Sequence, residues 1–186
     1  MNHADIHKDL IIASRDGSRA AQYELYRLYA DAMLNVCLRM VPQRDVAEDI
    51  LQEAFLKAFT KLHSFKFESS FGSWLKRIVI NDAINHMRKK KMDIDYMEDM
   101  HGVDETPEET YEGISEEDMS LNVEAIKHAI EQLPEGFRVV FSLYAVEGYD
   151  HSEISEILGI TISTSKTQYS RARNKIRKLL TNEMCG

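Results

Sequence analysis

The chain of 186 residues is long enough for one ordinary domain or two small ones, and its 44 % apolar and 29 % charged residues are typical of a soluble globular protein. It has no run of the roughly 20 apolar residues that a transmembrane helix needs, and its start lacks the basic flank and apolar stretch of a secretory signal. Two cysteines are too few for a disulfide framework or a four-cysteine zinc site. The low content of proline and glycine, three and eight residues, predicts an all-α fold.

The net charge of −8 is spread unevenly along the chain. Residues 1–91 carry 15 basic and 11 acidic side chains, and residues 125–186 carry eight basic and seven acidic ones. The segment between them, residues 92–124, carries 13 acidic side chains and no basic one. Because such charge runs are usually solvated and poorly ordered, we expect two small helical domains, residues 1–91 and 120–186, joined by a flexible acidic linker, residues 92–119.

The first domain shows helical periodicity in three segments. Apolar residues recur at spacings of three and four over Ala20 to Met40. Asp45 and Glu48 have the spacing of a capping box and precede a second helix, near Val46 to Leu62. A polar loop with two aromatic residues then leads into a third helix, from about Phe71 to Lys90.

A loop and a helix of this domain carry residue types that suit single-stranded DNA, because such sites combine positive charge with aromatic stacking surfaces. These residues are Phe65, Phe67, Trp74, Arg77, Asn81 and Arg88. Each also has a structural interpretation. The aromatic rings are typical core residues, and the basic run that begins at Arg88 would complement the dipole at a helix C-terminus. The acidic face of the second helix could likewise be an ordinary solvated surface.

The last domain begins with two short helices, Leu121 to Leu133 and Phe137 to Val146, separated by a proline. Asp150 and Glu153 form a second capping-box pair and open a third helix. Gly159 then supplies a turn, and a fourth helix follows from Ile162 to Leu180, with six basic residues and no acidic one.

Two helices joined by a short glycine-containing turn are typical of a DNA-binding helix-turn-helix, whose second helix enters the major groove. Short polar side chains near the start of that helix approach base edges, while arginine and lysine reach bases or phosphates. The alternative is a basic amphipathic helix whose charges lie in water. The residues predicted to contact DNA are Lys166, Thr167, Ser170, Arg171 and Arg173.

Three motifs in this order resemble the extracytoplasmic-function (ECF) class of bacterial RNA polymerase sigma factors. The segment Ala47–Phe55, with the sequence AEDILQEAF, resembles conserved region 2.2 of that family. The segment Phe71–Ile78, with Asn81 and Arg88, is similar to regions 2.3 and 2.4. Residues 132–173 resemble region 4.

The resemblance implies a function for each motif. Region 2.2 binds the clamp of the beta-prime subunit, and this role falls on Glu48, Asp49, Gln52 and Glu53. Regions 2.3 and 2.4 melt and recognise the −10 promoter element, and region 4 recognises the −35 element. The family often has Gly, Thr and Val at the start of the recognition helix, whereas this chain has Ser163, Thr164 and Ser165, so the contact between the two helices is less apolar than usual.

The partners that the resemblance implies are core RNA polymerase, through its beta-prime clamp and beta subunit, promoter DNA and an anti-sigma factor. It implies a cytoplasmic transcription initiation factor and no enzyme, with no metal or other cofactor, no small-molecule substrate and no direct membrane insertion. Its acidic linker either mimics an RNA phosphate chain in polymerase channels or acts as a spacer. The alternative function is a non-sigma helix-turn-helix regulator that binds duplex DNA, but such a protein would not need the acidic face of residues 48–53.

Overall fold

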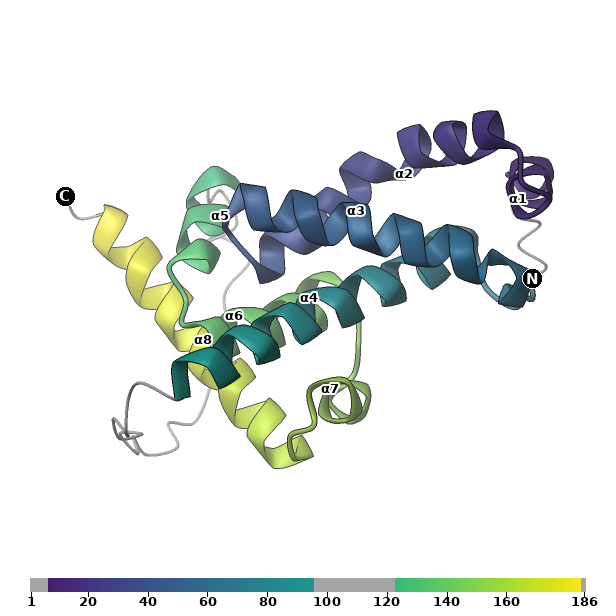
Figure 1. Ribbon diagram of the computed structural model, residues 1–186. Coiled ribbons are helices and arrows are strands. Elements are labelled where there is room, and N and C mark those ends of the chain that lie inside the picture. Colours follow the sequence, from purple (N-terminus) through teal and green to yellow (C-terminus); the bar gives the residue numbers. More distant parts are fainter. Residues whose placement is uncertain (1–6, 96–122, 185–186) are drawn as a thin grey trace.

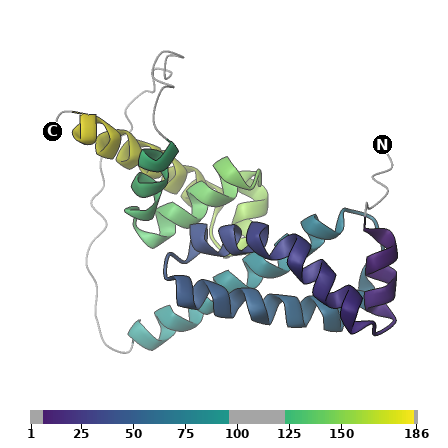
Figure 2. The same ribbon diagram turned by 90° about the horizontal axis from the view of Figure 1, so that it is seen from above.

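The computed structural model describes residues 7–95 and 123–184, and all the regular elements in these ranges are helices, which confirms the all-α fold (Figure 1). Helices before residue 96 form a first unit, and helices after residue 122 form a second unit that lies against it (Figure 2). Apart from residues 92–95, which belong to the last helix of the first unit, the predicted acidic linker lies outside the described residues.

The first unit is a bundle of three long helices with a short helix at one end. Its elements are α1 (Lys8–Arg15), α2 (Arg19–Met40), α3 (Arg44–Lys61), the 3-10 turn η1 (Leu62–Ser64) and α4 (Phe71–Asp95). Side chains such as Leu25, Cys37, Ala54, Leu75 and Val79 are fully buried between α2, α3 and α4. The apolar residues that predicted α2 to α4 therefore form the core of this unit.

Two helix boundaries in the first unit differ from the predicted ones. The prediction of a capping box at Asp45 was wrong, because α3 begins at Arg44 after Gln43, whose side chain makes no capping hydrogen bond. Glu48 instead pairs with Arg44 one turn earlier, with Nε and Oε1 2.8 Å apart. Helix α4 continues to Asp95, since no glycine or proline interrupts the helical pattern after Lys90.

The second unit contains the predicted helix-turn-helix. Its elements are α5 (Val123–Glu131), α6 (Glu135–Phe141), the π-helix η3 (Ser142–Val146), α7 (His151–Leu158) and α8 (Ile162–Met184). The capping box of α7 is confirmed: Glu153 N donates to Asp150 Oδ1 at 2.8 Å, and Asp150 N donates to Glu153 Oε2 at 2.9 Å. Gly159 has a φ of +68°, which ends α7 in the left-handed conformation that glycine adopts without strain.

The buried apolar residues form two clusters of unequal size. The smaller one lies between α5 and α8 and contains Ala129, Leu133, Ala172, Ile176 and Leu180. The larger one continues from the bundle of α2, α3 and α4 into the second unit, where it includes Val139, Val140, Leu143 and Ile154. The two units therefore share one apolar core, and α6 and α7 are the helices that bring the second unit to it.

Candidate nucleic-acid and protein interfaces

The predicted polymerase-binding residues form one polar face of α3. Glu48, Asp49, Gln52 and Glu53 are one, three, four or five positions apart, so they lie on the same side of the helix. All but the half-buried Glu48 are exposed. Each glutamate has a nearby cation one turn away, but both pairs lie at the surface and leave the face accessible. We call these four residues the α3 face.

The α3 face borders a hollow of about 180 Å³ between α2 and α3, which sequence analysis did not reveal. The lining of the hollow includes Tyr26 and Asp31 from α2 together with Glu48 and Gln52 from α3. Leu56 lies one turn after Gln52 on the same side of α3, and it is 68 % exposed. An apolar residue on the polar side of an amphipathic helix is the signal that would have pointed to Leu56.

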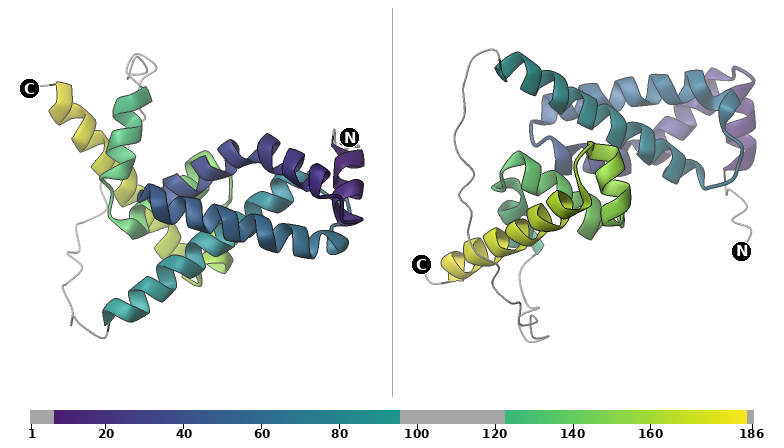
Figure 3. Two further views of the ribbon diagram at one scale, coloured as in Figure 1. Left: turned by 45° about the horizontal axis from the view of Figure 1, so that its top comes forward. Right: turned by 90° about the horizontal axis from the view of Figure 1, so that it is seen from below.

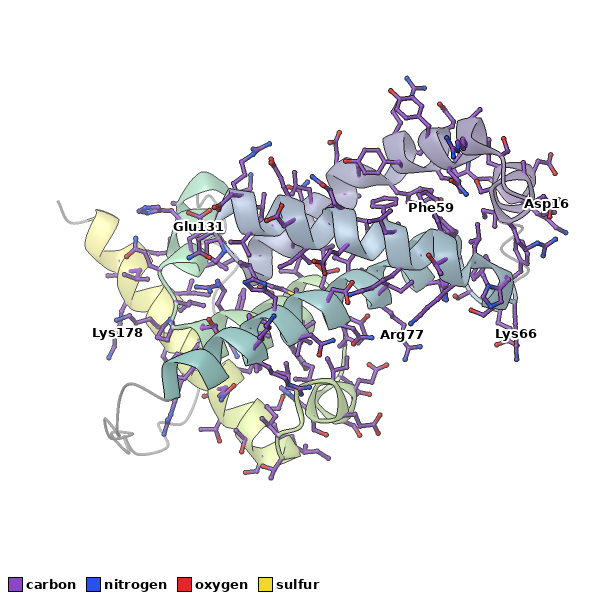
Figure 4. The ribbon with its side chains drawn as sticks, viewed as in Figure 1. Asp16, Phe59, Lys66, Arg77, Glu131 and Lys178 are labelled. Atoms are coloured by element: carbon purple, nitrogen blue, oxygen red, sulfur yellow. The ribbon has the colours of Figure 1, made fainter. Side chains whose placement is uncertain are left out.

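The loop before α4 holds a cluster of aromatic rings. Phe65 is only 5 % exposed, and its ring centroid lies 4.7 Å from that of Phe67 and 5.2 Å from that of Trp74. Phe67 is half-buried and has a φ of +58°, an unusual conformation for a bulky residue. Lys66, between them, is exposed and projects from the loop (Figure 4). Phe65 and Trp74 thus support the loop, and Phe67 is the aromatic residue nearer its surface.

The predicted −10 residues of α4 have different surroundings. Arg77 and Asn81 are exposed, and Arg77 projects from α4 on the side where α7 lies (Figure 4). Arg88 donates from Nη2 to the backbone oxygen of Ile157, at the end of α7, at 3.3 Å. The structure therefore leaves Arg77 and Asn81 open to solvent but places Arg88 in contact with the second unit.

Helix α8 lies on the outside of the second unit, with no other helix in front of it in the right panel of Figure 3. Lys166 and Thr167 are exposed, while Ser170 and Arg171 are half-buried. Arg173 is also half-buried, and its guanidinium lies 5.9 Å from the ring centre of Tyr169. These side chains border one surface of α8, which the exposed Ser163 extends toward the helix start.

The start of α8 is fixed by two polar contacts. Thr161 Oγ1 accepts a hydrogen bond from Thr164 N at 3.0 Å, as the side chain of an N-cap residue does. Ser165, on the inner side of α8, is fully buried, and its Oγ lies 2.9 Å from Nδ1 of His151 in α7. The ring of Tyr144 stacks on His151 with centroids 4.4 Å apart. Sequence analysis had assigned no role to His151.

The pKa values of His151, in the helix-turn-helix, and of Cys37, in the core of the first unit, are shifted by their surroundings. Burial lowers the pKa of His151 below its usual value, and the positive charge of Lys166 acts in the same direction, against a smaller opposing effect of Asp150. Burial raises the pKa of the Cys37 thiol to about 12, with a smaller contribution from Asp82. The buried thiol is therefore protonated at neutral pH, as expected of a core cysteine.

The parts of the chain that the structure describes contain no group of three metal-binding side chains. In the same residues, no helix is both long and apolar enough to cross a membrane.

Comparison with known families assigns the two units. The model of Sigma-70 region 2 matches residues 25–92, which span α2, α3 and most of α4. The model of Sigma-70 region 4 matches residues 123–176, which span α5 to α7 and much of α8. The two regions thus occur in the order that sequence analysis predicted, and they favour a sigma factor over a non-sigma regulator.

Similar proteins match over nearly their whole length. The ECF RNA polymerase sigma factor SigW of Bacillus subtilis is 33 % identical over 173 residues, covering 89 % of this chain and 92 % of that protein. The RNA polymerase sigma-H factor of Pseudomonas aeruginosa is 30 % identical over 186 residues, covering 93 % of each chain. Among solved structures, the sigma factor RpoE in complex with the anti-sigma factor NepR from Bartonella quintana has a TM-score of 0.55 at 25 % identity, covering 86 % of this chain and 96 % of that one. This chain belongs to the ECF family of RNA polymerase sigma factors.

Proposed function

We propose that three separate surfaces of this sigma factor bind the partners needed for promoter recognition and transcription initiation. The α3 face binds core RNA polymerase, the surface of α4 and the loop before it binds the −10 element, and the outer surface of α8 binds the −35 element. The observation that carries this division is the separation of charge between the units: an exposed acidic face on α3 and an exposed basic surface on α8. Surfaces of opposite charge suit a protein partner and DNA, respectively.

The charge of the α3 face and the neighbouring hollow support its assignment as the surface that binds the clamp of the beta-prime subunit. Three carboxylates and an amide offer acceptors to a basic partner helix, and the neighbouring hollow supplies a recess for one of its side chains. Leu56 adds an exposed apolar contact at the end of this surface. Apolar anchors next to charged groups are the usual composition of an energetically important interface.

The −10 surface combines Lys66 and Phe67 of the loop with Arg77 and Asn81 of α4. Asn81 presents both a donor and an acceptor, which allows it to distinguish base edges, whereas the cations attract the phosphates of an unpaired strand. Phe65 and Trp74 contribute by holding Phe67 in place. Arg88 joins this surface once it is released from Ile157.

The −35 surface lies on α8. Thr167, Ser170 and Arg171 lie near the start of the helix and face the major groove, where short polar side chains and arginine bind base edges. Lys166 and Arg173 flank them on the phosphate side. The second unit also contacts the beta subunit.

An anti-sigma factor is a further partner. The RpoE structure that this chain resembles contains such a factor, NepR, and the two chains match over most of their length. By this similarity, the protein is held inactive in the cytoplasm until the inhibitor is removed. Its relatives are named as sigma factors, and the role proposed for this chain is likewise that of a specificity factor and not an enzyme.

The experiment that tests the polymerase surface is a binding measurement with core RNA polymerase. The variant Asp49→Arg with Glu53→Arg should bind core polymerase far more weakly and should lose promoter-directed transcription, with unchanged helicity. The matched control is Asp16→Arg with Glu131→Arg, which reverses two exposed charges that do not belong to α3. Equal core affinity of the α3 variant and the control would contradict the proposal.

A further inference from the structure

The start of α8 lies against α7 and is joined to it by a buried polar contact (Figure 1). Ser165 is fully buried, and its Oγ lies 2.9 Å from Nδ1 of His151. The pKa of His151 is lowered by burial and by Lys166, so the ring is neutral at neutral pH, with one nitrogen that donates and one that accepts. The hydroxyl and the neutral ring therefore satisfy each other, and the first turn of α7 is tied to the first turns of α8.

The ring of His151 also belongs to an aromatic stack that connects four elements of the second unit. Tyr144 from η3 lies nearly parallel to it, with centroids 4.4 Å apart. Tyr169 from α8 lies 5.8 Å from His151 and 4.5 Å from Tyr144. Phe141, the last residue of α6, stacks on Tyr169 at 5.9 Å. Because stacked and edge-to-face rings attract one another, these contacts hold the imidazole in one orientation and aim Nδ1 at Ser165.

The contacts with His151 reach α8 along a single stripe. Ser165, Tyr169 and Arg173 are four positions apart, so they lie on the same side of the helix. The first contacts Nδ1 of His151, the second contacts the ring, and the third has its guanidinium 5.9 Å from the ring centre of Tyr169. Lys166 and Thr167 follow Ser165 directly and are exposed. The residues to which we assign −35 binding therefore lie on this stripe or next to it.

We infer that His151 is a positioning residue for −35 recognition, which sets the inclination of the first turns of α8 through its contact with Ser165. This role rests on the proposed function of α8. His151 does not need to touch DNA, because it acts through Ser165 on the side chains that follow it. A valine at position 165, which the family often has, would pack against α7 without a preferred direction. A hydrogen bond between two oriented groups depends on both distance and angle, so it defines the position of the helix more narrowly.

The size of the expected movement shows why base contacts depend on His151. The later part of α8 is anchored separately, since Ala172 and Ile176 are buried in the cluster shared with α5. Ala172 follows Ser165 by seven residues, or about 10 Å along the helix axis. A tilt of about 10° around Ala172 would move the helix at Ser165 by about 1.8 Å. Donor–acceptor distances of hydrogen bonds vary by only about 0.5 Å. The tilt would therefore break contacts with base edges, whereas flexible lysine side chains could still reach phosphates.

The test measures sequence specificity in the holoenzyme of this protein with core RNA polymerase. The wild-type holoenzyme first selects its preferred duplex from promoter fragments that are randomised around position −35. The specificity ratio is the affinity for the selected duplex divided by the affinity for a duplex with the −35 sequence scrambled. His151→Gln should lower this ratio at least about fivefold, which is the discrimination that one base contact provides. Its affinity for the scrambled duplex should not change.

The matched control is the other amide at the same position, His151→Asn. Both amides remove the ring and its stacking, but they place their polar atoms differently. The amide of asparagine begins at the same carbon that bears Nδ1 in histidine, whereas that of glutamine lies one bond further from the backbone. His151→Asn should therefore keep the contact with Ser165 and a specificity ratio close to that of the wild type. Ser165→Ala should lower the ratio as His151→Gln does, and the double variant should lose no more than either single one.

The outcomes separate the role of His151 from the function of α8. Circular dichroism checks that each variant is folded at the assay temperature. If folded His151→Gln keeps the specificity ratio of the wild type, the positioning role is wrong; should this variant not fold, an unchanged ratio for Ser165→Ala contradicts the role in the same way. If His151→Asn loses as much as His151→Gln, or if the losses of the two single variants multiply in the double one, His151 does not act through Ser165. If the wild-type holoenzyme selects no sequence at −35, the proposed function of α8 fails instead.

Discussion

Ser165 Oγ and His151 Nδ1 lie 2.9 Å apart and join the two helices of the helix-turn-helix through a polar contact. The sequence indicated that the inner side of α8 was less apolar than usual at Ser165, but it did not show what replaced the apolar contact. His151 fills that place from the first turn of α7, and Tyr144 covers its ring. The angle between the two helices is therefore held by a hydrogen bond as well as by packing.

We expect this contact to make the second unit sensitive to acid. The pKa of His151 is lowered in the folded state by burial and by Lys166, against the opposing charge of Asp150. The neutral ring therefore stabilises the folded state at pH values above about 6.5, which is the pKa of histidine in the unfolded chain. This contribution is lost as the pH falls through the lower pKa that His151 has in the folded state. In thermal unfolding, the wild type should be more stable than His151→Gln at neutral pH, and this difference in stability should shrink below about pH 6.5. A difference in stability that stays constant from pH 8 to 5 would contradict this. The control is His86→Gln, because His86 is exposed on α4.

Loss of the Ser165 hydroxyl should destabilise the protein even at neutral pH. The variant Ser165→Ala removes the hydrogen bond to His151 and leaves its ring nitrogen without that partner, at a cost of about 1 kcal/mol. Unfolding with denaturant measures this loss, in the transition in which the second unit unfolds. The control Ser163→Ala removes an exposed hydroxyl two residues earlier and should have little effect, so equal stability of the two variants would rule out the structural role of this contact.

Leu56 should contribute to core polymerase binding without contributing to folding. It is the most exposed large apolar side chain in the parts of the chain that the structure describes, and it follows the α3 face by one turn. Leu56→Ala should weaken binding to core polymerase roughly tenfold, or about 1.4 kcal/mol, because the variant removes apolar surface that the complex would bury. Thermal stability should not change. Leu28 is also exposed but lies on α2, so Leu28→Ala should not change the affinity for core polymerase.

The two kinds of contact proposed for α8 should differ in a salt titration. Arg171→Ala should reduce affinity for a duplex −35 site by about 1–3 kcal/mol and relax specificity at one base pair, because the side chain contacts a base edge. Lys166→Ala should weaken binding to all sequences alike and lower the salt slope by about one, as expected for a phosphate contact. Lys166 is exposed in the first turns of α8. Binding to mutated −35 sites that is unaffected by Arg171→Ala would remove this residue from the base-contacting set.

Local patterns were sufficient to predict most of the helices. Apolar spacing located α2, α3 and α4, and the signals at Asp150, Glu153 and Gly159 located the helix-turn-helix, because these depend on residues within one or two turns of each other. The start of α3 was predicted wrongly because Asp45 and Glu48 have the spacing of a capping box but lie inside the helix. Helix α1 was not predicted, since its eight residues make only about two turns, and so short a segment is not distinguished from other structures by periodicity alone.

The contacts between the units were beyond the reach of sequence analysis for a physical reason. Arg39 and Glu147 are 108 positions apart, and no local pattern reports which charges meet across such a distance. The same limit applies to Arg88, whose charge and position suggested DNA binding but whose partner in the structure is a backbone oxygen of α7. The candidate site was thus predictable as a set of residue types on helix faces, while its accessibility depends on tertiary packing.

The −10 surface offers the most direct test of the function assigned to α4. An unpaired strand exposes base edges and keeps its phosphates, so a protein that holds it needs an edge-recognising group close to cations. Asn81 is exposed on α4 between Arg77 and Arg88 and has the donor and acceptor that a base edge requires. Asn81→Ala should weaken binding to a single-stranded −10 oligonucleotide by about 1 kcal/mol, or roughly fivefold, through the loss of its hydrogen bonds.

The controls for Asn81 use neighbours in the same helix and loop. Asn85→Ala, exposed one turn later, should leave single-strand binding near the wild-type value. Phe67→Ala should reduce single-strand binding, while Phe65→Ala should mainly lower stability, because Phe65 is buried among three other rings. Binding to a duplex −35 site should be the same for Asn81→Ala as for the wild type. If Asn81→Ala leaves single-strand affinity intact, then Asn81 does not contact the −10 strand.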